Sequence, residues 1–153
     1  MSERLSPEQQ NALLEDITLV LVHTLPAAWQ ESVIVHRAVG SHSETLGQVR
    51  KISGPGLPSL WTPPPAVAEL FARLRSGMHE EGLGTWFSAK FRLTFPFTYQ
   101  IEYNRADEPT WAAPPPAEAY ADELRLHPRA PEHIPSWLQK PHGHQQARPQ
   151  EST

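Results

Sequence analysis

A repeated alternation between residues 87 and 104 constrains the fold of this chain more than any other feature. In both halves of the segment the even-numbered positions are mostly polar, whereas the odd-numbered positions are apolar, namely Phe87, Ala89, Phe91, Leu93, Phe97, Tyr99, Ile101 and Tyr103. Period-two alternation over this length is typical of half-buried strands. The segment therefore predicts an antiparallel hairpin with one apolar face and one polar face.

The shared parity of the two arms also predicts how they pair. Because both arms bury their odd residues, the numbers of two paired residues must sum to an even number. A centre at Pro96 places Lys90 opposite Glu102 and Arg92 opposite Gln100. We expect a cross-strand ion pair on the outer face of this hairpin. By the same parity, Trp86 is expected on the polar, exposed face.

Other patterns predict the rest of the fold. Ser6, Pro7 and Gln9 form the capping-box start of a helix that must stop before Pro26. The remaining expected elements are a strand over 29–39, a turn at 40–43, a weaker strand to about Ile52, a proline-rich loop over 53–65, a helix over 67–78 and a last helix from about Ala117 that ends at Pro128. This order, α-β-β-α-β-β-α, favours an α+β fold with an antiparallel sheet of about four strands and helices packed on one face.

The chain length fits one domain of ordinary size. Its 153 residues suffice for a single core, and we expect one α+β domain over residues 1–139. From Lys140 onward the sequence is polar and has almost no apolar anchor. Residues 140–153 are therefore predicted to form a disordered tail.

Composition narrows the classes of function. The 13 basic and 17 acidic residues give a net charge of −4, which mildly favours a basic partner and argues against nucleic acid. The absence of cysteine excludes disulfides, thiol catalysis and thiolate metal sites. The first residues lack a signal-peptide pattern, and the longest apolar segment, residues 17–22, is too short to span a bilayer. We therefore expect a cytoplasmic protein with no membrane partner.

No motif for catalysis or for a cofactor is recognisable. The histidines lie on different predicted elements or in the tail and form no HExxH pair. Ser88 lies within an alternating strand, which is unlike the glycine-flanked elbow of a serine nucleophile. Gly54 and Gly56 lack the spacing and the lysine of a phosphate-binding loop. The sequence thus predicts no catalytic residue, no metal and no cofactor.

The densest acidic group follows the predicted hairpin and comprises Glu102, Asp107 and Glu108, with Asp122 and Glu123 further on. It allows three interpretations: an acid/base pair in a pocket, an anionic face for a basic partner, or a solvated hairpin exit. The solvated exit is the preferred interpretation, because charge clusters usually stay in water. Trp111 beside these charges moderates that preference, because aromatic anchors rimmed by charge are enriched in interfaces. The predicted partner-binding residues are Trp86, Lys90, Arg92, Glu102, Asn104, Asp107, Glu108 and Trp111.

A set of short segments, taken in their order along the chain, carries a resemblance to a known family. They are LRSGM at 74–78, GLGTWF at 82–87, YN at 103–104, EPTW at 108–111, Tyr120, LR at 124–125 and PSWL at 135–138. Together they resemble the YezG-like antitoxin or immunity proteins of bacterial polymorphic toxin systems, and more closely the actinobacterial proteins and domains that accompany TNT-like NAD-glycohydrolase toxins. The resemblance extends from the first helix to Leu138.

The resemblance implies a small non-catalytic α+β protein that binds and neutralises a cognate toxin domain. The toxin would be a nuclease or an NAD-degrading enzyme, and acidic groups of this chain would meet basic groups of its substrate cleft. Two other classes stay open. One is a small hydrolase in which Glu102 and Asp107 converge with a histidine such as His36, and the other is a non-inhibitory interaction module of a toxin or secretion cluster. The oligomeric state is also open, because exposed edge strands can pair between chains.

Overall fold

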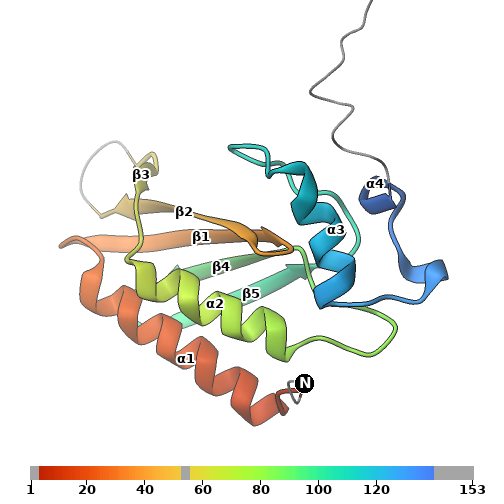
Figure 1. The fold of residues 1–153 in the computed structure, drawn as a ribbon. Helices are drawn as coiled ribbons and strands as arrows, with labels where there is room; N and C mark the ends of the chain where they lie inside the picture. The colour runs from red at the N-terminus through yellow and green to blue at the C-terminus, as the bar shows by residue number, and fades with distance from the viewer. Residues whose placement is uncertain (1–3, 53–55, 140–153) are drawn as a thin grey trace, which may run out of the picture.

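The computed structural model describes residues 4–52 and 56–139 and has the expected α+β fold (Figure 1). The predicted tail at 140–153 lies outside the described residues. The helices are α1 (Pro7–Thr24), α2 (Pro65–Gly77), α3 (Ala117–Leu126) and α4 (Ser136–Gln139), with a 3-10 turn at Pro131–His133. The strands are β1 (Trp29–Val39), β2 (His42–Lys51), β3 (Ser59–Trp61), β4 (Ser88–Thr94) and β5 (Thr98–Asn104).

Prolines lie at or directly before the start of the three longer helices. In α1 the side chain of Ser6 accepts a hydrogen bond from the backbone of Gln9, and the side chain of Gln9 accepts one from the backbone of Ser6, so the capping box is confirmed. The residues before α2 and α3 are Pro64 and Pro116, both in extended backbone. Proline suits a helix start because its missing N–H would have no partner within the helix.

All neighbouring strands pair antiparallel, in the order β3-β2-β1-β4-β5. The predicted hairpin register is confirmed, since Lys90 lies opposite Glu102 and Arg92 opposite Gln100. The ion pairs of the described residues do not include one between Lys90 and Glu102. Arg92 instead pairs with Glu31 of β1. The register prediction was correct, but the cross-strand ion pair expected within the hairpin is not formed.

The sheet has one strand more than the expected four. Strand β3 lies within the predicted loop at 53–65 and pairs with residues 47–49 of β2. Only three residues long and flanked by prolines, it is too short to produce an alternating pattern. Proline is tolerated there because an edge strand needs hydrogen bonds on one side only.

Helices α1 and α2 lie side by side on one face of the sheet (Figure 1). The even-numbered residues of β1 from Ser32 to Ala38 and the odd-numbered residues of β4 point toward them, and Ile34, Phe91 and Leu93 are fully buried. On the helices, Ile17, Leu21, Val67, Phe71 and Leu74 complete this core. The expected packing of helices on one face is therefore observed.

Helix α3 lies at one end of the sheet and covers a second, smaller core of Val39, Phe87, Ala119, Tyr120 and Leu138. The side chain of Arg75 donates a hydrogen bond to the Glu123 carboxylate and another to the carbonyl of Trp86. The backbone N–H of Gly40 also donates to Glu123. This buried carboxylate thus joins α2, α3 and the β1–β2 turn, and it fixes the end of the sheet that supports the hairpin exit.

Candidate functional site

The face of the sheet opposite α1 and α2 carries cross-strand rows of side chains without a helical cover. One central row contains Lys90, Val35 and Leu46, and the next contains Arg92, Val33 and Gln48. The flanking rows contain Arg37 with Glu44 at one end and Glu31 with Arg50 at the other. Apolar residues thus occupy the middle of this face and charged residues surround them.

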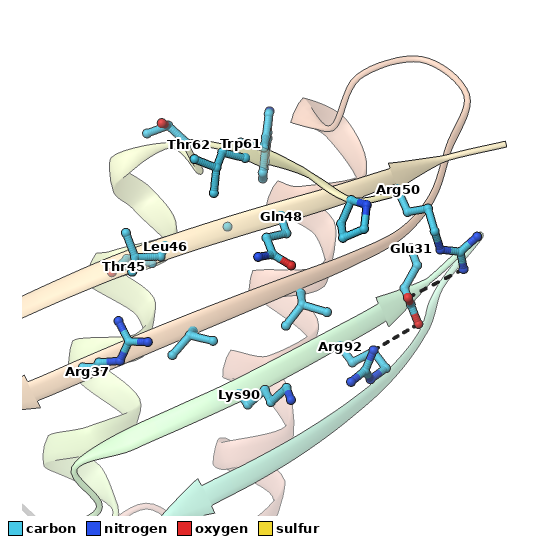
Figure 2. Close-up of a pocket in the computed structure, with 15 residues that line it drawn as sticks. Glu31, Arg37, Thr45, Leu46, Gln48, Arg50, Trp61, Thr62, Lys90 and Arg92 are labelled. Atoms are coloured by element: carbon cyan, nitrogen blue, oxygen red, sulfur yellow. Dashed lines mark hydrogen bonds and ion pairs between the residues drawn. The ribbon is translucent and has the colours of Figure 1, made fainter. Parts of the chain in front are cut away.

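These rows form the floor of a groove of about 580 Å³, which we call the basic groove. Its lining residues are Glu31, Val33, Val35, Arg37, Thr45, Leu46, Gly47, Gln48, Arg50, Pro58, Leu60, Trp61, Thr62, Lys90 and Arg92. Figure 2 shows Arg37, Lys90 and Arg92 along the open face, with Trp61 and Thr62 at the β3 side. Strand β3 and the residues around it therefore form one wall of a groove that is otherwise open to solvent.

Basic residues exceed acidic residues in this groove. Arg50 and Arg92 share one carboxylate, that of Glu31, at 3.6 and 3.3 Å (Figure 2). Arg37 pairs with Glu44 at 2.7 Å. Lys90 is exposed and belongs to no ion pair with the described residues. The groove is therefore positively charged on a chain whose net charge is −4.

Glu44 holds the loop after β5 close to the sheet. Its carboxylate accepts hydrogen bonds from the backbone N–H groups of Ala112 and Ala113 and from the side chain of Arg37. Burial by itself raises the pKa of Glu44, but these hydrogen bonds and the Arg37 charge outweigh it, so the pKa lies below its usual value. Glu44 therefore stays ionised and keeps the 109–113 segment beside β2.

A second groove of about 470 Å³, the hairpin-exit groove, adjoins the basic groove and shares Val35, Arg37 and Lys90 with it. It is also lined by Ser88, Ala89, Glu102, Tyr103, Asn104, Asp107, Glu108, Pro109 and Thr110. The side chain of Asn104 accepts a hydrogen bond from the Asp107 N–H and donates one to the Asp107 carbonyl. Asn104 thus folds the turn that places Asp107 and Glu108 at the rim.

Five of the eight predicted binding residues lie together in the hairpin-exit groove: Lys90, Glu102, Asn104, Asp107 and Glu108. Lys90 also lines the basic groove, as does a sixth, Arg92. The structure thus brings these six residues onto one continuous surface.

The prediction that Trp86 is exposed was wrong. Trp86 is fully buried, and its indole N–H donates to the Met78 sulfur at 3.3 Å. Its ring packs near His36 and Tyr103. Strand β4 begins only at Ser88, so the alternation does not extend back to Trp86, and this residue belongs to the core and not to the open face.

Trp111 is half-buried and lines neither groove. Its ring packs edge-on against His42 at 5.5 Å between centroids, and it contacts the second core. Its indole N–H is buried without a hydrogen-bond partner in the described structure. Trp111 therefore packs against His42 and the second core and does not present an exposed aromatic anchor.

The constellation considered for a hydrolase is not assembled. His36 is 1% exposed on the helix-covered side and stacks on Phe71, whereas Glu102 lies opposite Lys90 on the open face. Burial, with a contribution from the nearby Arg75 charge, lowers the pKa of His36 from 6.5 to about 4. Glu123, grouped with the acidic residues in the sequence, is fully buried against Arg75. Neither residue is available to the open face.

Residues of β1 and β2 in the basic groove were not predicted as binding residues. The signal was present in the run Ser32–His36, where apolar residues occupy both parities of a strand. Such a run indicates apolar side chains on both faces of the sheet. Combined with Arg37 and Arg50 at the ends of the same face, it would have indicated an apolar floor with a basic rim.

The described residues include no group of three or more histidine, aspartate or glutamate side chains placed to hold a metal ion. Within the same residues, no helix has both the length and the apolar character needed to cross a membrane. No family model and no curated protein matches this chain. Its candidate function therefore depends on the geometry of the open face and on the family resemblance.

Proposed function

We propose that this chain is a non-catalytic immunity or antitoxin-like protein that binds a bacterial toxin domain through the open face of its sheet. The observation that carries the proposal is the continuous surface formed by the basic and hairpin-exit grooves, on which six of the eight predicted binding residues lie. The resemblance to YezG-like proteins supplies the toxin as the expected class of partner.

The open face suits a protein partner because it combines apolar and charged contacts. Val33 and Val35 are half-buried, and Leu46 and Leu60 are 40% and 86% exposed. A partner that covered them would remove apolar surface from water, while the surrounding charges would select its orientation. Since α1 and α2 cover the opposite face, the partner would add a layer to the sheet without disturbing the core.

The mechanism we propose is steric. A toxin domain seated on this face would have its substrate cleft covered, and this chain would need no reactive group of its own. The carboxylates of Glu102, Asp107 and Glu108 would meet basic groups that otherwise hold an anionic substrate. An NAD-degrading enzyme and a nuclease both require such basic groups, so both stay open as the toxin.

The test is capture followed by neutralisation. The tagged chain is incubated with a lysate of its host, retained proteins are identified by mass spectrometry, and each is expressed alone and together with this chain. We expect one retained protein that stops growth when expressed alone and permits growth when co-expressed. A variant with Glu102→Lys and Glu108→Lys should capture less of it, whereas Glu118→Lys with Glu132→Lys changes the net charge equally at exposed sites outside both grooves.

The alternative is a non-inhibitory interaction module of a toxin or secretion cluster. It predicts a specific retained protein that is harmless when expressed alone or whose toxicity persists on co-expression. Either result would overturn the immunity function while leaving the open face as a binding surface. Absence of any specifically retained protein would remove the main support for both functions.

A further inference from the structure

We propose that the basic groove binds an extended acidic segment of the partner protein in which carboxylate and apolar residues alternate. The identity of that partner as a toxin rests on the proposed function. The preference of the groove for acidic peptides can be measured without an identified toxin. This inference differs from the partner expected from the sequence, because the overall charge of −4 favoured a basic partner.

The first argument is charge. Arg37, Arg50, Lys90 and Arg92 face the groove, and two carboxylates, Glu31 and Glu44, pair with three of them. Four cations against two carboxylates leave an excess of two positive charges. Lys90 has no ionic partner among the described residues, and Arg50 and Arg92 each have only a share of Glu31. Carboxylates of a partner would complete these incomplete pairs.

The second argument is spacing. Lys90 and Arg92 are two residues apart on β4 and point to the same face, so their Cα atoms lie about 7 Å apart. Alternate side chains of an extended partner segment have the same repeat. Val35 and Val33 lie beside these two cations on β1, and Leu46 and Leu60 lie further toward β3. Successive side chains of an extended segment point to opposite sides. A segment that lies on edge along β1 would therefore direct its carboxylates toward Lys90 and Arg92 of β4 and its apolar residues toward Leu46 and Leu60 of β2 and β3.

Nucleic acid fits this surface less well. A phosphate backbone carries a charge at every nucleotide, so it would also place charges close to Glu31 in the basic groove and to Glu102, Asp107 and Glu108 in the adjoining hairpin-exit groove, whereas a short peptide segment can confine its carboxylates to the cations. An excess of two charges also provides little counterion release, which supplies much of the affinity of nucleic-acid binding. A polypeptide can combine a few carboxylates with apolar side chains, and this is the combination that the groove presents.

The experiment measures binding of fluorescein-labelled peptides by anisotropy. The probes are a ten-residue peptide of alternating glutamate and valine, a matched peptide of alternating lysine and valine, and a ten-nucleotide oligothymidylate. We expect the unmodified chain to bind the glutamate peptide saturably, with an affinity that falls as salt is added, and at least tenfold more tightly than either other probe. Tighter binding of the lysine peptide or of the oligonucleotide would overturn the proposal, as would no saturable binding of the glutamate peptide.

Two charge-reversal variants locate the site. Lys90→Glu with Arg92→Glu should weaken binding of the glutamate peptide at least tenfold. Arg73→Glu with Arg125→Glu changes the net charge equally on the exposed surfaces of α2 and α3, and it should leave affinity within about threefold. Equal weakening by both pairs would show that only the overall charge matters and would overturn the groove assignment. Lys90→Gln with Arg92→Gln gives a partial loss in the same direction if the reversal variant does not fold.

The outcomes separate this inference from the proposed function. Binding of the glutamate peptide without capture of any toxin would overturn immunity and leave the groove assignment intact. Capture and neutralisation of a toxin by both the unmodified chain and the Lys90→Glu, Arg92→Glu variant would support immunity and overturn the role of the groove.

Discussion

The two faces of the same strands differ in what their side chains do. On the helix-covered face, Ile34 of β1 and Phe91 of β4 are fully buried. On the open face of these strands, Val35 is half-buried and Lys90 is exposed. Adjacent residues in the chain therefore have different roles, since one set stabilises the fold and the other is free to contact a partner. Changes on the two faces should separate stability from binding.

The largest difference in the free energy of unfolding is expected between alanine variants of the neighbours Phe91 and Arg92. Phe91→Ala removes a fully buried ring from the main core and should lower the free energy of unfolding by about 3–5 kcal/mol. Arg92→Ala removes a partly exposed side chain and one ion pair with Glu31, and should lower it by less than about 1 kcal/mol. Urea unfolding followed by circular dichroism measures both. Losses of similar size would contradict the conclusion that the helix-covered face stabilises the fold more than the open face does.

A buried and a partly exposed ion pair extend the comparison beyond the sheet. In the pair of Arg75 and Glu123 the side chains are 5% and 0% exposed, whereas in that of Arg92 and Glu31 they are 39% and 26% exposed. Arg75→Ala leaves the Glu123 carboxylate buried without its cation and should cost about 3–5 kcal/mol. The matched control is Glu31→Ala, which breaks the exposed pairs and should cost less than about 1 kcal/mol. An equal cost for the two variants would show that burial does not set the contribution of these pairs.

The helix-covered face should also make stability depend on pH through His36. Its folded pKa of about 4 lies below the ordinary 6.5, so between these values the unfolded chain binds a proton that the folded chain excludes. The free energy of unfolding is therefore unaffected by His36 above pH 6.5. As the pH falls from 6.5 toward 4, protonation of His36 in the unfolded chain lowers it by on the order of 3 kcal/mol. Unfolding measured from pH 4 to 7 should show a smaller decrease for His36→Asn than for the unmodified chain. The same slope in both proteins would assign the pH dependence to other groups.

The hairpin was predictable from sequence because its information is local. Alternation between residues 87 and 104, with Pro96 at the centre, was enough to predict the register of β4 and β5. Strand β3 was not predictable in the same way, because three residues carry no periodicity and depend on pairing with β2. Trp86 was misplaced because a strand boundary depends on tertiary contacts, here those with Met78 and Tyr103.

The part of the candidate site that depends on local sequence was also predicted. The hairpin-exit groove is formed largely by residues close in sequence, so Glu102, Asn104, Asp107 and Glu108 were recognised together. The basic groove needs β1, β2 and β4 to lie side by side, and no local pattern places Arg50 and Arg92 on either side of Glu31. The net charge of the whole chain could not reveal the basic groove, because the excess of acidic residues elsewhere in the chain is larger than the basic excess in the groove.

The smallest expected effect is the coupling energy between Lys90 and Glu102, which measures whether charges on the open face contribute to stability. Lys90 and Glu102 lie directly opposite each other, yet they form no ion pair in the described structure. A double-mutant cycle with Lys90→Ala and Glu102→Ala should therefore give a coupling energy within about 0.3 kcal/mol of zero, at the low end for exposed charges. The cycle of Arg92→Ala and Glu31→Ala, whose charges are in contact, is the matched comparison. A coupling above about 1 kcal/mol for Lys90 and Glu102 would mean that Lys90 is already paired in solution. Its charge would then be less available to an acidic partner than the structure indicates.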